Sequence, residues 1–181
     1  AMNKTIDKLR AEHRNLVKLL SVLKREIDSY ASGGTADFDL VNDILTYHQN
    51  FPDACHHPKE DLIYTHLQNR DPDAAKAVGD LDKEHGEMRV LVGRLALAVN
   101  NVMNDHLLPR EWFADVAGEF INFMQRHMKM EEVVFFPAAE RSLLAEDWED
   151  VEAKLADLAD PVFDVSVEER YESIHRSIMT A

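Results

Sequence analysis

Cysteine, long apolar runs and positive charge are all scarce in this sequence, and each shortage excludes a class of protein. The only cysteine is Cys55, so the chain forms no internal disulfide and builds no zinc site from several thiolates. No stretch of 18 apolar residues occurs, and the N-terminal residues lack the apolar segment of a signal peptide. We therefore expect a soluble, cytoplasmic protein without a membrane-spanning helix.

Acidic residues far outnumber basic ones. Lys and Arg total 20, Asp and Glu total 34, and the net charge at pH 7 is -14. A field of this sign repels the phosphates of nucleic acids and of anionic membranes, so we expect neither as a partner. The 181 residues suffice for one domain with a sizeable core, or for one core with a small appendage.

Apolar residues recur at intervals of three and four along most of the chain, which predicts long amphipathic helices. The pattern is interrupted at the Gly33-Gly34 pair, at a turn over residues 69–73 and before Pro109. Thr35 or Asp37 is suited to capping the second expected helix, and Asp71 the third. The expected helices span about residues 3–30, 35–67, 71–104 and 109–137. Long helices with short loops predict an all-α fold, an antiparallel four-helix bundle over residues 1–140.

The second expected helix contains Pro52 and Pro58. Each proline lacks a backbone donor and crowds the preceding turn, so we expect a kink or an irregular turn near His56 and Glu60. The alternative is that one helix ends at Pro52 and another begins there.

Residues 141–181 predict two shorter helices. Asp147 is placed to cap the first, and Ser166 with Glu169 forms a capping-box pattern at the start of the second. Amphipathic helices of this length are marginal alone. We therefore expect this C-terminal extension to pack on the bundle or on a partner subunit.

One pair of residues occurs twice in the chain. His127 and Glu131 are four residues apart and therefore share one helix face. His56 and Glu60 repeat the same spacing 71 residues earlier, and acidic, apolar and aromatic residues follow in both segments.

A second motif repeats at nearly the same shift. Leu-x-x-Glu-His13 matches Leu-x-x-Glu-His85, 72 residues later, and both histidines stand in the apolar stripe of a helix. Each half of the chain therefore supplies two histidines and one carboxylate to the expected interior.

These buried polar residues point to metal. A carboxylate buried without a partner costs several kcal/mol, and proteins avoid this by pairing it, protonating it or coordinating a cation. Four histidines and two carboxylates suit two divalent cations, each with two imidazoles and with both carboxylates bridging. Nitrogen and oxygen ligands without thiolate favour iron or manganese and allow zinc. The candidate ligands are His13, His56, Glu60, His85, His127 and Glu131.

The doubled motif, with Val-Val-Phe-Phe-Pro after Glu131, resembles the hemerythrin-like, or HHE cation-binding, domains over about residues 5–140. The resemblance implies a four-helix bundle around a non-haem di-iron centre, bridged by oxo or hydroxo, with the same six residues as ligands. Oxygen-carrying hemerythrins have a histidine where Arg89 stands and a longer histidine-to-aspartate spacing in the last helix. The sequence is more similar to members that repair iron centres or respond to oxygen, nitric oxide or iron.

We therefore expect a di-iron protein that binds or senses O2 or NO, or that takes part in iron handling or a stress response. Two alternatives stay open. One is an enzyme that reduces peroxide or nitric oxide at the same irons. The other is a metal-free helical interaction module in which the histidines satisfy one another.

Several other residues have more than one interpretation. His57, paired with Asp61, either joins or replaces His56, because Pro58 makes the helical period unreliable there. His48 is a further ligand, a partner of a ligand, or a core histidine bonded to the backbone. Tyr47 and Tyr64 line the pocket or belong to the core.

Surface positions are expected for His66, His106 and His175. We expect Glu132 and Asp61 to face solvent or other helices. Phe135 and Phe136 either shield the site from water or pack the end of the helix.

Overall fold

The regular structure of the chain is helical. The computed structural model describes residues 3–158 and 164–180, and within these ranges it contains helices and no strand, which confirms the all-α class. The elements are α1 (Lys4–Ala31), α2 (Phe38–Phe51), η1 (Pro52–His56), α3 (His57–Arg70), α4 (Pro72–Val78), α5 (Leu81–Met103), α6 (Arg110–Met130), η2 (Glu131–Phe135), α7 (Phe136–Ser142), α8 (Ala145–Leu158) and α9 (Asp164–Met179).

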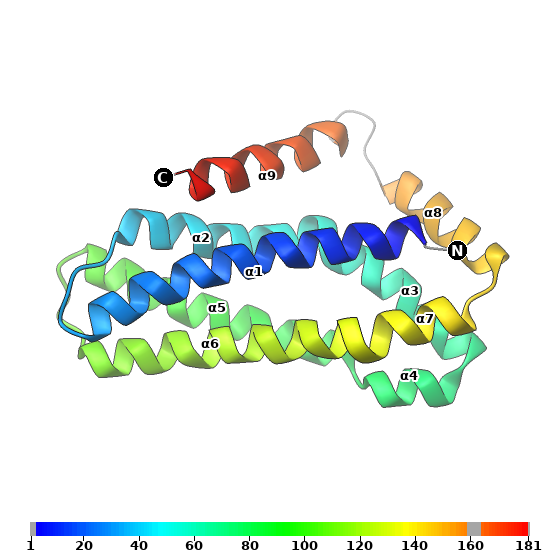
Figure 1. Cartoon of the computed structure of the whole chain (residues 1–181), viewed down its shortest axis with the longest axis horizontal. Helices are drawn as coiled ribbons and strands as arrows, with labels where there is room; N and C mark the ends of the chain where they lie inside the picture. Colours follow the sequence, from blue (N-terminus) through cyan, green and yellow to red (C-terminus); the bar gives the residue numbers. More distant parts are fainter. Residues whose placement is uncertain (1–2, 159–163, 181) are drawn as a thin grey trace.

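Four long helical segments lie side by side along the long axis of the molecule (Figure 1). They are α1, the continuous run α2-η1-α3, α5, and the continuous run α6-η2-α7. α1 contacts α2 and α6, and α5 contacts the same two helices, so the four segments enclose a common interior. The apolar stripes predicted from the sequence face this interior.

Side-chain caps mark the starts of α1, α2, α4 and α5. The Asn3 carboxamide oxygen accepts hydrogen bonds from the amides of Thr5 and Ile6 at the start of α1. Asp37 accepts one from the Leu40 amide at 3.0 Å, as the sequence predicted. Such caps satisfy amide groups that have no partner within the helix.

The prediction of one unbroken third helix was wrong. Asp71 caps the short helix α4, which begins at Pro72, ends at Val78 and is followed by Gly79, where φ is +91°. α5 then begins at Leu81, with Asp80 as its cap. A positive φ is typical of glycine and ends an α-helix, so the apolar spacing across this point does not mark a continuous stripe.

A π-helical turn interrupts the second and the fourth long segment. η1 and η2 each end two residues before a proline, Pro58 and Pro137 respectively. In η1 the His57 amide donates to the Pro52 carbonyl, five residues back. The wider turn accommodates the missing donor and the crowding of the proline that follows. The predicted irregularity near His56 is confirmed, and the chain stays helical through Pro52.

The buried apolar side chains form two clusters at different heights along the molecule. One includes Leu16, Leu95 and Phe120 and lies among α1, α2, α5 and α6. The other includes Leu9 and Ile63 and lies among α1, α3, α4, α7 and α8. His13 follows Leu9 and precedes Leu16 on α1, so a polar layer separates the two clusters.

The two C-terminal helices contact the long segments of their own chain. α8 contacts α3, where Arg70 Nε donates to Asp147 Oδ2 at 2.8 Å. α9 lies along α2 and α1 (Figure 1). The Ser166 side chain of the predicted capping box lies outside the described residues. Among the described helices, none has the length and hydropathy needed to cross a bilayer.

Candidate metal centre

All six candidate ligands meet in the polar layer between the two apolar clusters. Each of the four long segments contributes at least one of them, and every one is at most 4% exposed. This degree of burial decides the electrostatics of the site, because water is excluded from the ionisable groups. The residues are His13 on α1, His56 in η1, Glu60 on α3, His85 on α5, His127 on α6 and Glu131 in η2.

The histidine Nε2 atoms point toward the two carboxylates. His56 Nε2 lies 2.8 Å from Glu60 Oε1, and His127 Nε2 lies 2.7 Å from Glu131 Oε1. His13 Nε2 is 3.0 Å from Glu131 Oε2. The two glutamates therefore stand at the centre of a ring of imidazoles.

The outer Nδ1 atoms each face a further carboxylate. His56 Nδ1 is 2.8 Å from Glu12, His57 Nδ1 is 2.9 Å from Asp53, and His127 Nδ1 is 2.6 Å from Glu84, all within hydrogen-bond distance. The other two contacts involve residues adjacent to the inner glutamates: His13 to Glu132 at 2.8 Å and His85 to Asp61 at 3.8 Å. A carboxylate on one ring nitrogen directs the lone pair of the other nitrogen inward, as in metal-bound histidines.

The two halves of the sequence repeat build two matching halves of the site. Glu12 holds His56 from α1, and its counterpart Glu84 holds His127 from α5. The sequence contained the signal for both, because a glutamate precedes the histidine in each repeat. Glu132 faces another helix, as one of the two expected alternatives, and there its carboxylate holds His13 of α1.

His57 departs from this symmetry. The candidate ligands fall into two groups of four residues. Within each group, one ligand atom from every residue lies within 4.8 Å of the others, and Glu60 belongs to both groups. His57 joins the group on the α5 side, so the centre has five histidines and not four, and one side holds three imidazoles. The groups are His57, Glu60, His85 and His127, and His13, His56, Glu60 and Glu131. Of the two interpretations of His57, the structure favours joining His56, not replacing it.

Burial and opposite charge compete at the ionisable groups of the centre. Burial lowers the pKa of His56, but Glu60 and Glu12 outweigh this effect and raise the pKa to about 10. For His127, burial is likewise outweighed by Glu131 and Glu84, and the pKa rises to about 10. Burial, with a smaller contribution from His85, lowers the pKa of His57 to about 4.

The carboxylates show the same competition. Burial and the neighbouring Glu131 raise the pKa of Glu60, but His56 and His85 reverse the balance and leave it at about 2. Burial also opposes ionisation of Glu131, whose pKa nevertheless falls well below its usual value because of His127 and His13. Both carboxylates are therefore anionic at neutral pH and need positive charge beside them.

Hydrogen bonding leaves this centre incomplete. Both carboxylate oxygens of Glu60, both of Glu131, and Nε2 of His85 are buried and make no hydrogen bond of good geometry within the described part of the chain, although imidazole nitrogens lie close to the carboxylates. These five atoms converge on one small volume, and each is a ligand atom for a divalent cation. The residues present therefore fit the metal pair that the sequence predicted.

The space at the centre is small and shielded. A cavity of about 10 Å³, lined by His13, His56, His57, His127 and Glu131 among others, holds about one water molecule. Phe136 is fully buried and stacks on His13, with ring centroids 5.3 Å apart. Its contact with a candidate ligand supports the shielding interpretation beside that of helix-end packing.

Other histidines are placed differently from the sequence expectations. His175 is buried, not on the surface, and its Nε2 lies 3.3 Å from the Asn15 carbonyl, because α9 covers this face of α1. His66 is partly buried beside Asp150 of α8. His106 is exposed, as predicted. Among the described residues, His48 belongs to neither ligand group and makes no hydrogen bond to the backbone.

The two tyrosines considered for the pocket lie outside the cavity lining. Tyr47 is buried in the core against Phe51, with ring centroids 5.0 Å apart. The Tyr64 hydroxyl donates to the Gly79 carbonyl and helps to fix the turn between α4 and α5. Both have structural roles here.

The chain was compared with known families and proteins. The family model of the hemerythrin HHE cation binding domain matches residues 4–139 and matches residues 80–170 as well. Comparisons with curated proteins and with solved structures found no match. The first family match spans most of the chain and contains every residue of the polar layer. The chain therefore belongs to the family of hemerythrin HHE cation-binding domains.

Proposed function

We propose that this protein binds a pair of metal ions, with iron as the physiological metal, between five histidines and two glutamates. The observation that carries the proposal is the convergence of the buried, unpartnered oxygens of Glu60 and Glu131 on inward-facing imidazoles. Iron fits a set of nitrogen and oxygen ligands without thiolate, and manganese or zinc would substitute. The proposed ligands are His13, His56, His57, Glu60, His85, His127 and Glu131.

The ligand set is unequal on its two sides. His57, His85 and His127 serve one metal position, whereas only His13 and His56 serve the other. Glu60 and Glu131 face both positions and would bridge them. With one imidazole fewer, the position beside His13 leaves more room for a small ligand.

We propose that the centre binds or senses a small ligand such as O2 or NO, or takes part in iron handling. When bound, the metal pair supplies redox activity and an open coordination position. The protein holds the imidazoles in place through the outer carboxylates and excludes water with Phe136 and the apolar clusters. Reduction of peroxide or nitric oxide is the enzymatic alternative at the same centre.

The metal-free interaction module is the main rival to this proposal. In that state His56 and His127, with pKa values raised to about 10, are protonated and balance the two glutamates. Such pairing neutralises the charge, but the close contacts of His56 with Glu60 and of His127 with Glu131 lack good hydrogen-bond geometry in the described part of the chain. We therefore regard the protonated state as the metal-free form of a metal-binding protein.

The metal content of purified protein tests the proposal. After expression with added iron we expect about two metal ions per chain, near-ultraviolet absorption typical of a bridged ferric pair, and a change in these bands on addition of azide. Glu60→Leu should abolish metal uptake, whereas His66→Ala, outside the centre, should not. Less than one equivalent of iron, manganese or zinc would contradict the proposal.

We further propose that the four long segments form an antiparallel four-helix bundle of the hemerythrin type. The contacts of α1 and α5 with both α2 and α6 support this arrangement. Residues 1–140 would be the metal-binding domain, and residues 141–181 an extension that stabilises it from outside. The cytoplasmic location stays a prediction.

A further inference from the structure

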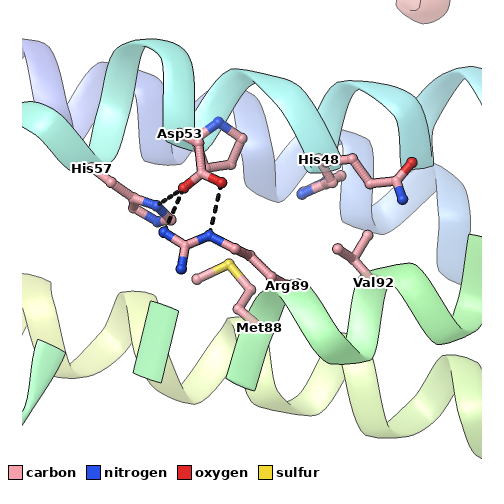
Figure 2. A pocket seen from close by; sticks show the side chains of 8 residues that line it. His48, Asp53, His57, Met88, Arg89 and Val92 are labelled. Carbon is pink, nitrogen blue, oxygen red and sulfur yellow. Dashed lines mark hydrogen bonds and ion pairs between the residues drawn. The ribbon is translucent and has the colours of Figure 1, made fainter. Parts of the chain in front are cut away.

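A second cavity lies next to the metal centre, between α2, η1 and α5 (Figure 2). Its volume is about 210 Å³, well above the roughly 15 Å³ that one water molecule requires. Its lining contains polar groups at the floor and at the mouth, with apolar side chains between them. The lining residues are His48, Gln49, Pro52, Asp53, His57, Met88, Arg89 and Val92.

The floor of this cavity contains an unusual histidine. The His48 side chain is 3% exposed, and neither ring nitrogen has a hydrogen-bond partner in the described part of the chain. The Phe120 ring packs edge-on against it, with ring centroids 5.5 Å apart. Burial of an imidazole without hydrogen-bond partners destabilises the folded protein. A molecule that hydrogen-bonds to His48 in the cavity would offset this cost.

An ion pair stands at the mouth. Arg89 on α5 reaches across to Asp53 in η1, donating from Nε at 2.8 Å and from a terminal nitrogen at 2.9 Å. In Figure 2, His57 lies on one side of this pair, and His48 and Val92 lie on the other. Asp53 and Arg89 are 40% and 51% exposed, in contrast to the buried floor, so this pair is the outer boundary of the cavity.

The cavity adjoins the metal centre directly. Pro52, His57 and Met88 line both this cavity and the small cavity among the candidate ligands. These three side chains therefore form the wall between the two spaces. Methionine has an unbranched, flexible side chain, so the wall is adaptable at Met88.

We propose that this cavity is a second binding site, specific for one small uncharged molecule that both donates and accepts hydrogen bonds. Hydrogen peroxide is the member of this class that the adjoining centre would use. Binding of a small molecule is inferred from the cavity alone. The choice of peroxide as that molecule rests on the proposed metal centre. His48 holds the molecule by one ring nitrogen, and the Asp53–Arg89 pair at the mouth retains it.

The charges around the cavity exclude ions. Burial lowers the pKa of His48 to about 3, so its ring is neutral and offers one donor and one acceptor. The positive charge of Arg89 is already balanced by Asp53, and the net charge of -14 on the chain opposes anions. An apolar molecule such as O2 or NO would leave His48 without a partner.

Nuclear magnetic resonance of the His48 ring tests the site without iron chemistry. We would titrate hydrogen peroxide into protein loaded with zinc, or into metal-free protein if zinc does not bind, and follow the ring nitrogen shifts. We expect a saturable shift at His48 with peroxide. In metal-free protein, where no metal is present to bind azide, azide should give no saturable shift. Failure of the metal proposal would appear separately, as absence of metal uptake, and would leave this experiment interpretable.

Two variants locate the bound molecule. Val92→Phe should fill the cavity and abolish the saturable shift, whereas Val90→Phe, on the exposed side of the same helix, should retain it. If Val92→Phe does not fold, Gln49→Trp should cover the mouth from the surface, with Asn50→Trp as its control. A shift that is linear in peroxide, that persists in both cavity variants, or that azide reproduces in metal-free protein would overturn the proposal.

Discussion

His57 stacks face to face on His85, with ring centroids 3.6 Å apart and ring planes inclined by 12°. The two rings come from different segments, α3 and α5, and both belong to the same group of candidate ligands. In oxygen-carrying hemerythrins the third helix itself supplies a second histidine, at the position of Arg89. Here the neighbouring helix places an imidazole beside His85 instead.

Replacement of His57 should therefore affect one metal position more than the other. In His57→Ala we expect the metal content at limiting iron to fall from about two ions per chain to about one, because the group around His85 loses one of its three imidazoles. Metal analysis after gel filtration measures this. His106→Ala, at an exposed histidine, is the control and should retain both ions. Equal loss of both ions would show that His57 does not belong to one side.

The outer carboxylates should matter nearly as much as the ligands. Glu12→Gln and Glu84→Gln remove the anionic partners of His56 and His127, at 2.8 Å and 2.6 Å. Loss of such a partner typically weakens metal binding by about 10- to 100-fold. We expect both variants to fall in this range, because the two residues occupy equivalent places in the repeat. Competition with a chelator measures the affinity.

The control for these two variants is Glu119→Gln, which alters an exposed ion pair with Arg94. It should leave the affinity for metal unchanged. An effect of Glu12→Gln or Glu84→Gln no larger than that of Glu119→Gln would mean that the outer carboxylates do not orient the ligands.

The helices and the six original candidate residues could be predicted from the sequence because both depend on local spacing. Apolar periodicity and the repeated His-x-x-x-Glu placed His56, Glu60, His127 and Glu131 on inward faces. The resemblance to a known family added the expectation of a metal pair. These features need no knowledge of how distant segments pack.

Other features depend on packing that the sequence does not display. His57 is adjacent to His56 and would face elsewhere on a regular helix, but it enters the centre just after a π-helical turn. The break at Gly79 depends on one backbone angle, and the burial of His175 depends on where α9 lies. His48 fits the helical stripe, but its lack of a hydrogen-bond partner among the described residues depends on how the neighbouring helices pack around it.

The charge state of the metal-free centre predicts a pH dependence of stability. His56 and His127 have pKa values of about 10 in the folded protein, above the value of about 6.5 in an unfolded chain. Their contribution to the free energy of unfolding is complete below about pH 6.5 and is lost as the pH rises through about 10. Thermal unfolding of metal-free protein should therefore occur at lower temperature at pH 10 than at pH 7.

Bound metal should remove this pH dependence of stability, because it replaces the protons on His56 and His127. Binding at pH 8 should release about two protons per chain, measurable by calorimetry in buffers with different ionisation enthalpies. In His127→Ala we expect one proton fewer. Binding without proton release would contradict the protonated state of the metal-free centre.

The repeat also predicts how to make the two sides of the centre equal. A shift of 71 residues carries His57 to Met128, a buried side chain that lines the central cavity next to His13. Met128→His should supply a third imidazole to the position that has only His13 and His56. We expect two metal ions to be retained, but with azide binding weakened by about 10-fold or more, since the added ligand occupies the open position.

Spectral titration with azide measures this effect, and Met103→His, at an exposed methionine, is the matched control. The control should bind azide as the unmodified protein does. If Met128→His keeps full azide affinity with both ions present, the small ligand does not bind beside His13. The open position would then have to lie on the side of His57, despite its larger number of imidazoles.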